Sequence, residues 1–329
     1  MCEEEDIMWR YIVKRLIWLV IIAVCVAILI FTVLYFVPKD PAAIAAGSNA
    51  TPEEIEFQRH VLGLDQPFFV QLGNYLYNTF IKFDLGTSFF YKLPVLAEFG
   101  SRLPRTVLLS LLCIAIDALI GIPLGITCAL HRNSFIDQGL MVLAMILISI
   151  PGFWLALLMV QLFSTTLNWL PPFGIGTWKH WVMPVIASAA GGIAQNARLT
   201  RSAVLETMRA DFVTTAKAKG VKNRSVIYKH MLPNAMIPII NSLGGRLAGV
   251  LSGTVIIETV FAFPGIGTYL TNAIAQSDYP VVRACILVMA LFSSAVMVIV
   301  DLVYAYIDPR IKAQYTKQAS GFLKRRARV

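Results

Sequence analysis

Residues 16–37 read LIWLVIIAVCVAILIFTVLYFV, a run of 22 residues that contains no charged side chain. About 20 consecutive apolar residues form a helix long enough to cross the hydrocarbon core of a bilayer. The alternative is a secretory signal peptide cleaved near the small residues 43–45. The apolar core of such a peptide has only about 7 to 15 residues, however. We therefore interpret 16–37 as a retained first membrane span.

Further apolar segments of similar length follow along the chain. They cover roughly 106–130, 136–165, 181–203, 235–257 and 283–307. The whole chain is 57% hydrophobic and 14% charged, whereas a soluble domain is about 25% charged. These features exclude a soluble protein and predict an all-α integral membrane protein with about six transmembrane helices.

The basic residues indicate how the spans are oriented. Most of the 28 lysines and arginines lie in segments that are cytoplasmic if the N-terminus is inside. The short outer loops hold only Lys179 in 166–180 and none in 258–282. Because cytoplasmic loops carry the excess of Lys and Arg, both termini are predicted to be cytoplasmic. The net charge of +9 then reflects membrane orientation and not nucleic-acid binding.

We accordingly divide the chain into four parts. Residues 1–37 are a leader, whose start at Met1 or Met8 stays open, and the first helix. Residues 38–102 are an extracytoplasmic segment, 103–308 a transmembrane domain with a cytoplasmic loop at 204–234, and 309–329 a basic cytoplasmic tail. The tail suits contact with anionic lipid headgroups, at about 1 kcal/mol per charge.

The extracytoplasmic segment carries the signals of two short helices. Thr51-Pro52-Glu53-Glu54 combines an N-cap threonine, a proline in the first turn and a glutamate at the third position. Gly63 marks the end of this helix. A second helix is predicted to begin near Phe68, and its aromatic side chains suit a membrane-interface belt with local packing.

The cytoplasmic loop is predicted to present a short helix around Asp211–Lys219, which Gly220 ends in a left-handed conformation. Phe212 and Ala216 share one face of this helix, with Val213 beside them. A second short helix follows and stops at Leu232-Pro233. A basic helix lying on lipid would need large apolar residues. The small residues here favour insertion into a groove of a cytoplasmic partner.

The loop resembles the EAA loop of ABC-importer permeases. In that loop a small-residue triplet, a glycine and a Leu-Pro pair recur at the offsets of Thr214-Thr215-Ala216, Gly220 and Leu232-Pro233. The chain departs from the pattern in having Thr214 in place of the glutamate and Thr215 in place of the first alanine. The stretch DFVTTAKAKG at 211–220 is similar to the version found in peptide-transport permeases.

Nine further strings extend the resemblance to nearly the whole chain and to the dipeptide/oligopeptide/nickel permease family, first (B-type) subunit. They are LGLDQPFFVQ, FDLGTSF, RLPRTVLLS, SIPGFWLALL, LPPFG, ARLTRSAVLE, ETVFAFPGIG, DYPVV and DLVYAYIDPRIK. The resemblance implies a type I importer fold in a bacterial or archaeal plasma membrane. It also implies a second homologous permease, two ABC ATPase subunits, an extracytoplasmic substrate-binding protein and a short-peptide substrate. Nickel or a metal chelate is the alternative cargo of the same family.

In that family, loop 209–233 would transmit movement from an ATPase. The residues expected to do so are Asp211, Thr214, Thr215, Ala216, Gly220, Leu232 and Pro233. The sequence contains no G-x-x-x-x-G-K-[ST] motif, so ATP and Mg²⁺ are expected on partner subunits and no cofactor in this chain. The cysteines and histidines lack metal-ligand spacing, and no G-x-S-x-G or H-E-x-x-H motif occurs. No metal site and no enzymatic activity are predicted.

Ionisable residues inside membrane spans are costly and therefore count as functional candidates. Asp117, Arg246 and Glu258 qualify, as path-lining groups or as structural pairs, with Glu258 at an outer helix end. Asp301 is interpreted as structural. A stand-alone secondary transporter or channel is the alternative from another class, but the sequence shows no inverted repeats.

Two glycine patterns and one outer turn complete the candidates. Gly245, Gly249 and Gly253, and likewise Gly121 and Gly125, recur every four residues. This spacing favours close helix packing, within the chain or against the second permease, over a substrate groove. The stretch ETVFAFPGIG is predicted to form a re-entrant turn near the outer mouth. Its residues Phe263, Pro264, Gly265 and Gly267 are the candidates for docking a binding protein.

Overall fold

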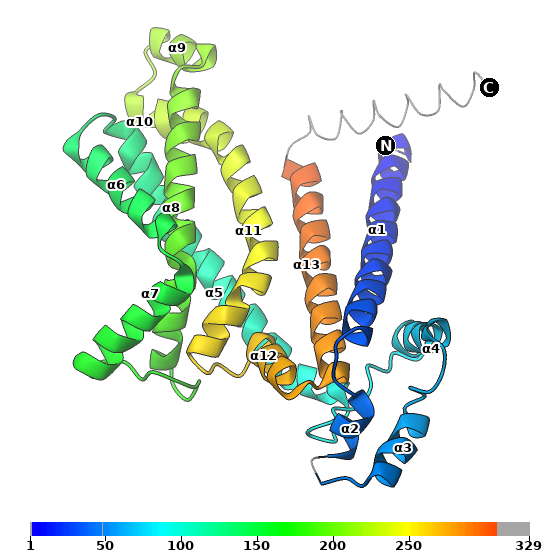
Figure 1. Cartoon of the computed structure of the whole chain (residues 1–329). Helices are drawn as coiled ribbons and strands as arrows, with labels where there is room; N and C mark the ends of the chain where they lie inside the picture. Colours follow the sequence, from blue (N-terminus) through cyan, green and yellow to red (C-terminus); the bar gives the residue numbers. More distant parts are fainter. Residues whose placement is uncertain (1, 48, 308–329) are drawn as a thin grey trace.

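The computed structural model describes residues 2–47 and 49–307, and these are helical almost throughout (Figure 1). The helices are α1 Cys2–Tyr35, α2 Pro41–Ala46, α3 Pro52–Val61, α4 Phe68–Phe80, α5 Val95–Leu130, α6 Phe135–Ser149, α7 Gly152–Met159, η1 Val160–Thr166, α8 Lys179–Met208, α9 Asp211–Ala218, α10 Asn223–Ser225, η2 Val226–Met231, α11 Leu232–Val260, α12 Ile266–Gln276 and α13 Tyr279–Ile307. η1 and η2 are π-helical. The β-structure in the described residues is one isolated bridge, Thr87 to Pro94. The expectation of an all-α chain is confirmed. The predicted tail at 309–329 lies outside the described residues.

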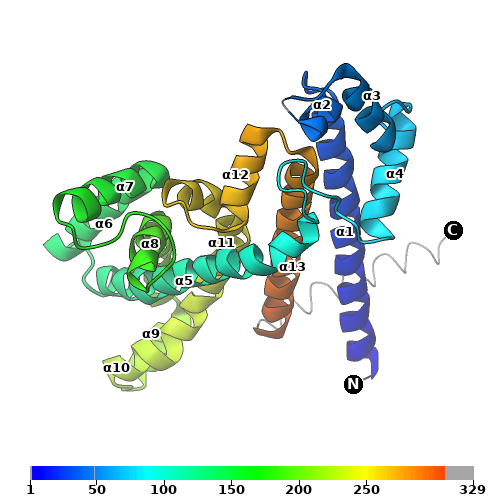
Figure 2. The same ribbon diagram turned by 90° about the horizontal axis from the view of Figure 1, so that it is seen from below.

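The helices form two groups that α11 connects. α5 packs along α8 with α6 and α7 beside them, and α1 packs along α13 (Figures 1 and 2). α11 contacts both α8 and α13. α9 lies at the same end of the molecule as the start of α1, and α2 and α3 lie at the opposite end (Figure 1). This arrangement matches the predicted separation of a loop on one side and a small segment on the other.

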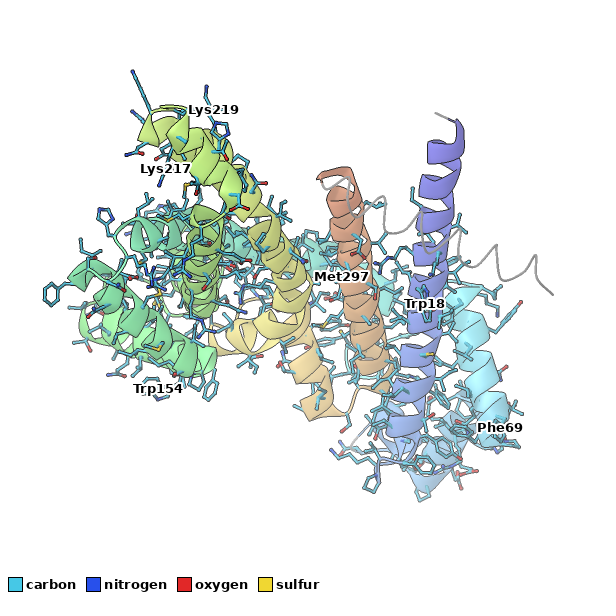
Figure 3. The ribbon with its side chains drawn as sticks, turned by 90° about the horizontal axis from the view of Figure 1, so that it is seen from above. Trp18, Phe69, Trp154, Lys217, Lys219 and Met297 are labelled. Carbon is cyan, nitrogen blue, oxygen red and sulfur yellow. The ribbon has the colours of Figure 1, made fainter. Side chains whose placement is uncertain are left out.

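Three described helical stretches are long and apolar enough to cross a membrane: Ile12–Tyr35, Val95–Leu130 and Tyr279–Leu302. Two bent pairs raise this number to five if each pair is one span. α8 covers the remaining predicted span, 181–203, and its polar residues, Asn196 and Thr200 among them, keep it outside this set. Large apolar side chains such as Trp18, Phe69 and Trp154 lie on the outer faces of the helices, as lipid contact requires (Figure 3).

The segment predicted as one continuous span, 136–165, is broken in the structure. α6 ends at Ser149, and the helical stretch Gly152–Thr166 continues at 98° to it. Ile150 between them has extended backbone angles, φ −81° and ψ 123°. Proline disfavours the helical conformation of the residue before it, so Pro151 accounts for the break. The predicted span 136–165 thus corresponds to two helical stretches bent at Pro151, which the hydrophobicity of the segment does not indicate.

The segment 38–102 has the two predicted helices. α3 begins with a capping box, in which Glu54 N donates to Thr51 Oγ1 at 3.3 Å and Thr51 N donates to Glu54 Oε2 at 2.7 Å. Gly63 follows the end of α3 with φ +65°, and α4 begins at Phe68. The Phe68 ring lies 5.8 Å from that of Phe31 in α1. The aromatic residues of this segment therefore contribute to local packing against the first span.

Gly121 and Gly125 allow α5 to approach α8 closely. A Cβ added at Gly121 would lie 2.8 Å from the carbonyl oxygen of Ile193, and one at Gly125 would lie 2.5 Å from that of Ala197. Both distances are too short for a real Cβ contact, so larger residues would push the two helices apart. The packing role predicted for this glycine pair is confirmed.

Candidate functional site

α9 is a short helix, and one of its faces contacts η2 and joins a cluster that also holds residues of α8 and α11. Val213 is 1% exposed and packs in a cluster that includes Val204 and Met231. Ala216, one turn further along, packs against the same cluster, whereas Phe212 is 43% exposed. The buried face is therefore Val213 and Ala216, three residues apart. Phe212 and Ala216 are one helical turn apart, as predicted, but the face that packs inward is centred on Val213 and leaves Phe212 exposed.

Gly220 ends α9 as predicted. Its φ is +74°, a left-handed conformation in which an L side chain is strained. Val221 N donates to Ala216 O at 3.2 Å and Gly220 N donates to Lys217 O at 2.9 Å, which together satisfy the last carbonyls of the helix. No described atom comes within 4 Å of a Cβ added at Gly220, so its requirement for glycine is conformational and not steric.

The predicted stop at Leu232-Pro233 is absent, and this prediction was wrong. α10, η2 and α11 follow one another directly, so the chain is helical from Asn223 to Val260. Pro233 sits in the first turn of α11, where its missing N–H and fixed φ are compatible with a helix. Leu232 packs against the cluster that holds α9. The proline thus marks a change from π- to α-helix and not an end.

The outer surface of this loop combines apolar and basic side chains. Lys217 and Lys219 project from the far end of the loop (Figure 3). Asp211, Thr214 and Thr215 are also exposed. Phe212 and Tyr228, which are 43% and 60% exposed, supply apolar surface. Of the residues singled out in this loop, the structure thus buries Ala216 and Leu232 in part and leaves the others open.

An ion pair that sequence reasoning missed ties α6 to α8 on the side of α9. Arg201 donates from Nε to Asp137 Oδ1 at 2.6 Å and from Nη2 to Asp137 Oδ2 at 2.7 Å. The Asp137 side chain is 2% exposed, and it also accepts from Asn133 N at 2.9 Å. The sequence does place Asp137 three residues after the N-cap Ser134, in the first turn of a helix. It does not indicate that the partner of this aspartate is an arginine 64 residues later.

Asp117 and Arg246 form an ion pair, one of the two roles that the sequence allowed for these intramembrane charges. Arg246 Nε donates to Asp117 Oδ2 at 2.8 Å. Asn196 Nδ2 donates to the other carboxylate oxygen at 2.8 Å, and Ser242 Oγ donates to Asn196 Oδ1 at 3.2 Å. The Asp117 side chain is 0% exposed and that of Arg246 is 22% exposed. The network therefore joins α5, α8 and α11, keeps the Asp117 carboxylate buried and presents the guanidinium outward.

This guanidinium lies in the wall of a cavity of about 630 Å³ between α6–α7, α8 and α11, which we call the central cavity. Its lining includes Ser188, Gly191, Gly192, Gln195, Ser242, Gly245, Arg246 and Gly249. No described atom comes within 4 Å of a Cβ added at Gly245 or Gly249. These two glycines thus do not pack against another helix of the described chain. They face open space within this chain, so the predicted packing inside the chain is wrong, and packing against a second permease stays a prediction.

Glu258 is a buried helix cap. It is 0% exposed, and its Oε2 accepts from Gly267 N at 2.7 Å and from Thr268 N at 3.2 Å. These two N–H groups belong to the first turn of α12, whose positive end stabilises a carboxylate. A Cβ added at Gly265 would lie 2.4 Å from Glu258 Oε2, so glycine there permits the contact. Glu258 and the outer turn, predicted separately, form one structural unit.

The outer turn does not expose its aromatic residue. Phe263 is 0% exposed, and its ring meets that of Trp181 edge-on at 4.8 Å. The carbonyl oxygen of Pro264 accepts from Arg105 Nη1 at 3.3 Å. Direct docking of a partner on Phe263 is therefore excluded by its burial, and the exposed residue of the turn is Ala262. Sequence reasoning missed this because a turn near a membrane surface was expected to be accessible.

Two remaining predictions concern charges and metals. Asp301 lies 2.8 Å from Arg15 Nη2, so it links α13 to α1, in keeping with a structural role. Among the described residues no group of three or more His, Cys, Asp or Glu could hold a metal ion.

Comparison with known families gives matches along nearly the whole chain. Residues 121–313 match the family described as the binding-protein-dependent transport system inner membrane component. Residues 8–110 match the N-terminal family of the same transport-system membrane components.

Individual proteins are similar over almost their full length. A peptide transport system permease protein of Brucella abortus (strain 2308) is 40% identical over 313 residues, which cover 93% of this chain and 99% of that protein. The glutathione transport system permease protein of Escherichia coli O6:H1 is 37% identical over 305 residues, with 93% and 99% covered.

Two solved structures share the fold at low sequence identity. They are inward-facing crystal forms of the MetNI methionine ABC transporter. The first has a TM-score of 0.57 at 15% identity and covers 64% of this chain and 97% of its own. The second has a TM-score of 0.55 at 16% identity and covers 65% and 97%.

Proposed function

This chain belongs to the family of binding-protein-dependent transport system inner membrane components, and from that premise we propose that it is the permease subunit of an ATP-driven importer of short peptides. It has the type I permease fold. The observation that carries the choice of cargo is the similarity, over 93% of the chain, to permeases named for peptide and for glutathione transport. Glutathione is itself a short peptide, so both names point to one chemical class.

We assign energy coupling to the loop 209–233. Its α9 contacts η2, and Val213 and Ala216 belong to a cluster that also includes Val204 of α8 and Ala235 of α11. A push on α9 would therefore pass through this cluster to the two long helices. The exposed Phe212 and the lysines around it suit a groove with apolar and acidic lining on an ATPase subunit. ATP and Mg²⁺ would be bound by two such subunits, and the pathway would be completed by a second homologous permease.

The same proposal orients the chain. Residues 1–37 would begin in the cytoplasm, and the loop 204–234 and the tail 309–329 would lie there. Residues 38–102 would face an extracytoplasmic substrate-binding protein. The transmembrane domain 103–308 would line the path in the bacterial or archaeal plasma membrane. The placement of α9 and the start of α1 at one end of the molecule supports this orientation (Figure 1).

Reconstitution tests the proposal. The chain is purified from its native membrane in mild detergent, and the co-purifying complex is placed in liposomes with its binding protein. We expect a second permease and ATPases with Walker motifs in the complex, and uptake of a tripeptide that requires ATP. Ala216→Asp places a carboxylate in the apolar cluster that holds α9, so it should abolish uptake while the complex still inserts into the membrane.

Other outcomes would replace the proposal. Uptake of a nickel chelate but not of peptides would move the cargo to the alternative within the family. Transport by this chain alone, driven by an ion gradient, would make it a stand-alone transporter and end the coupling assignment.

A further inference from the structure

The central cavity contains a single type of charge. Among the described residues that line it, Arg246 is the one charged side chain, and the others are apolar, glycine or neutral polar residues. Its volume of about 630 Å³ lies within the range of roughly 300–1,000 Å³ that small-ligand pockets occupy. Asp117 behind Arg246 balances its charge, so recognition rests on the guanidinium N–H donors that face the cavity. An anionic acceptor is the strongest partner for such donors.

Arg246 is held in place as a binding group would be. Asp117 lies fully buried behind it and takes the Nε hydrogen bond, so the cavity meets the guanidinium and not the carboxylate. Nη1 donates to Gln195 Oε1 at a long 3.4 Å. A guanidinium has five N–H groups, so donors remain that have no acceptor among the described residues. Those donors match the two oxygens of a carboxylate.

Glycine makes this arrangement possible on both sides of the guanidinium. A Cβ added at Gly192 would lie 2.1 Å from Arg246 Nη2 and 2.3 Å from Asp117 Oδ2, so only glycine leaves room for the pair. Gly245 and Gly249 sit on α11 before and after Arg246 and face open space. A peptide main chain can approach such a surface closely, because no side chain intervenes.

We propose that the central cavity is a peptide-binding site in which Arg246 binds the C-terminal carboxylate, with Gln195 and Ser242 available to the adjacent amide. This inference rests on the proposed function and adds to it the part of the substrate that is recognised. Asp117, Asn196 and Gly192 position the guanidinium and do not touch the peptide.

The test measures binding without the substrate-binding protein, which has its own selectivity. The permease–ATPase complex in nanodiscs, free of nucleotide, is titrated to millimolar concentration with trialanine or trialanine amide. Neither peptide has a side-chain carboxylate, so any difference reports the C-terminus. We expect trialanine to raise the Tm of the complex and the amide to bind about tenfold more weakly.

Two variants separate recognition from folding. Asp117→Leu/Arg246→Met removes both charges, so that no unpaired charge stays buried, and should abolish the preference for the free carboxylate. Asp40→Asn/Arg59→Gln removes an ion pair in the extracytoplasmic segment, 2.6 Å between Asp40 Oδ2 and Arg59 Nη2, and should leave the preference unchanged.

Equal binding of the two peptides, no binding of either, or a preference that survives in the double variant would each overturn the inference. Uptake of trialanine by the complete wild-type system is measured separately. If trialanine is taken up but binding shows no preference for the free carboxylate, the proposed function stands and this binding site is wrong. If trialanine is not taken up, the proposed function itself is contradicted.

Discussion

Gly220 is the residue whose requirement is most clearly conformational. It ends α9 at φ +74° with open space around its Cα, so a substitution there is strained by backbone angle alone. A non-glycine residue in the left-handed region costs about 1–2 kcal/mol, and a β-branched one more than asparagine.

We expect Gly220→Val to uncouple ATP hydrolysis from peptide uptake by displacing α9, while Gly220→Asn, which tolerates the same angles, keeps most of the uptake. Uptake and ATPase rates in proteoliposomes measure both. A valine variant that transports as fast as the asparagine variant would show that the end of α9 does not need this conformation.

Phe212 and Val213 are neighbours with opposite environments. Val213 is 1% exposed on the packed face of α9, and Phe212 is 43% exposed on the outer surface of the same helix. Val213→Ala should lower the stability of the complex by about 1–3 kcal/mol, because it leaves a small cavity under α9. Phe212→Ala should leave the melting temperature of the permease unchanged and weaken its association with the ATPase subunits.

Thermal melting in detergent and co-purification of the ATPases measure the two effects. If Phe212→Ala destabilises the isolated permease as much as Val213→Ala does, the assignment of an outer docking face is wrong.

At the scale of elements, the Asp137–Arg201 pair joins the start of α6 to α8. Two contacts of 2.6 and 2.7 Å on a carboxylate that is 2% exposed make this a desolvated, geometrically matched pair. Removal of Arg201 leaves the buried Asp137 carboxylate with the Asn133 N–H as its remaining partner. Loss of one partner of a buried pair costs about 3–5 kcal/mol, whereas removal of both costs much less.

We therefore expect Arg201→Met to lower the Tm strongly and Asp137→Leu/Arg201→Met to recover much of the loss. A double-mutant cycle on the melting temperature measures the coupling. The control is the more exposed pair Glu56–Arg59, at 3.1 Å, with side chains 58% and 34% exposed, for which the same cycle should give a much smaller coupling. Arg59 also pairs with Asp40, and the cycle cancels that contribution because both Arg59 variants lose it. Additive changes in melting temperature for the Asp137 and Arg201 substitutions would contradict a stabilising interaction between the two side chains.

At the scale of the whole molecule, α1 and α13 form one group whose contact depends on small residues. Ala23 and Ala27 of α1 are 2% and 0% exposed against Leu287 of α13. Arg15 and Asp301 join the same two helices at their other end. α4 packs on these two helices through its aromatic residues, so α1 and α13 together position the segment 38–102.

Ala27→Leu should separate α1 from α13 and lower stability by about 1–3 kcal/mol, since the added volume has no space to occupy. Ile21→Leu, at a position 42% exposed, is the control and should have little effect. Melting of the purified complex and protease sensitivity of residues 38–102 measure the result. Unchanged melting in Ala27→Leu would mean that α1 is not held by this contact.

Local chemistry was enough for the sequence to determine several features by itself. The helix around Asp211–Lys219, its end at Gly220 and the capping box at Thr51 depend on residues a few positions apart, so the printed sequence contains all the information they need. The apolar runs likewise determine an all-helical membrane protein, since only helices satisfy the backbone within one segment.

The tertiary structure alone decided which distant residues meet. Arg246 pairs with Asp117 across 129 positions and Arg201 with Asp137 across 64, and no local rule selects these partners. The same holds for burial, which turns Val213 inward and Phe263 against Trp181. The same four-residue glycine spacing also has two different surroundings. At Gly121 and Gly125 a neighbouring helix lies against the glycines, whereas Gly245 and Gly249 line the central cavity. A periodic pattern identifies a helix face, but what that face meets depends on how the other helices pack around it.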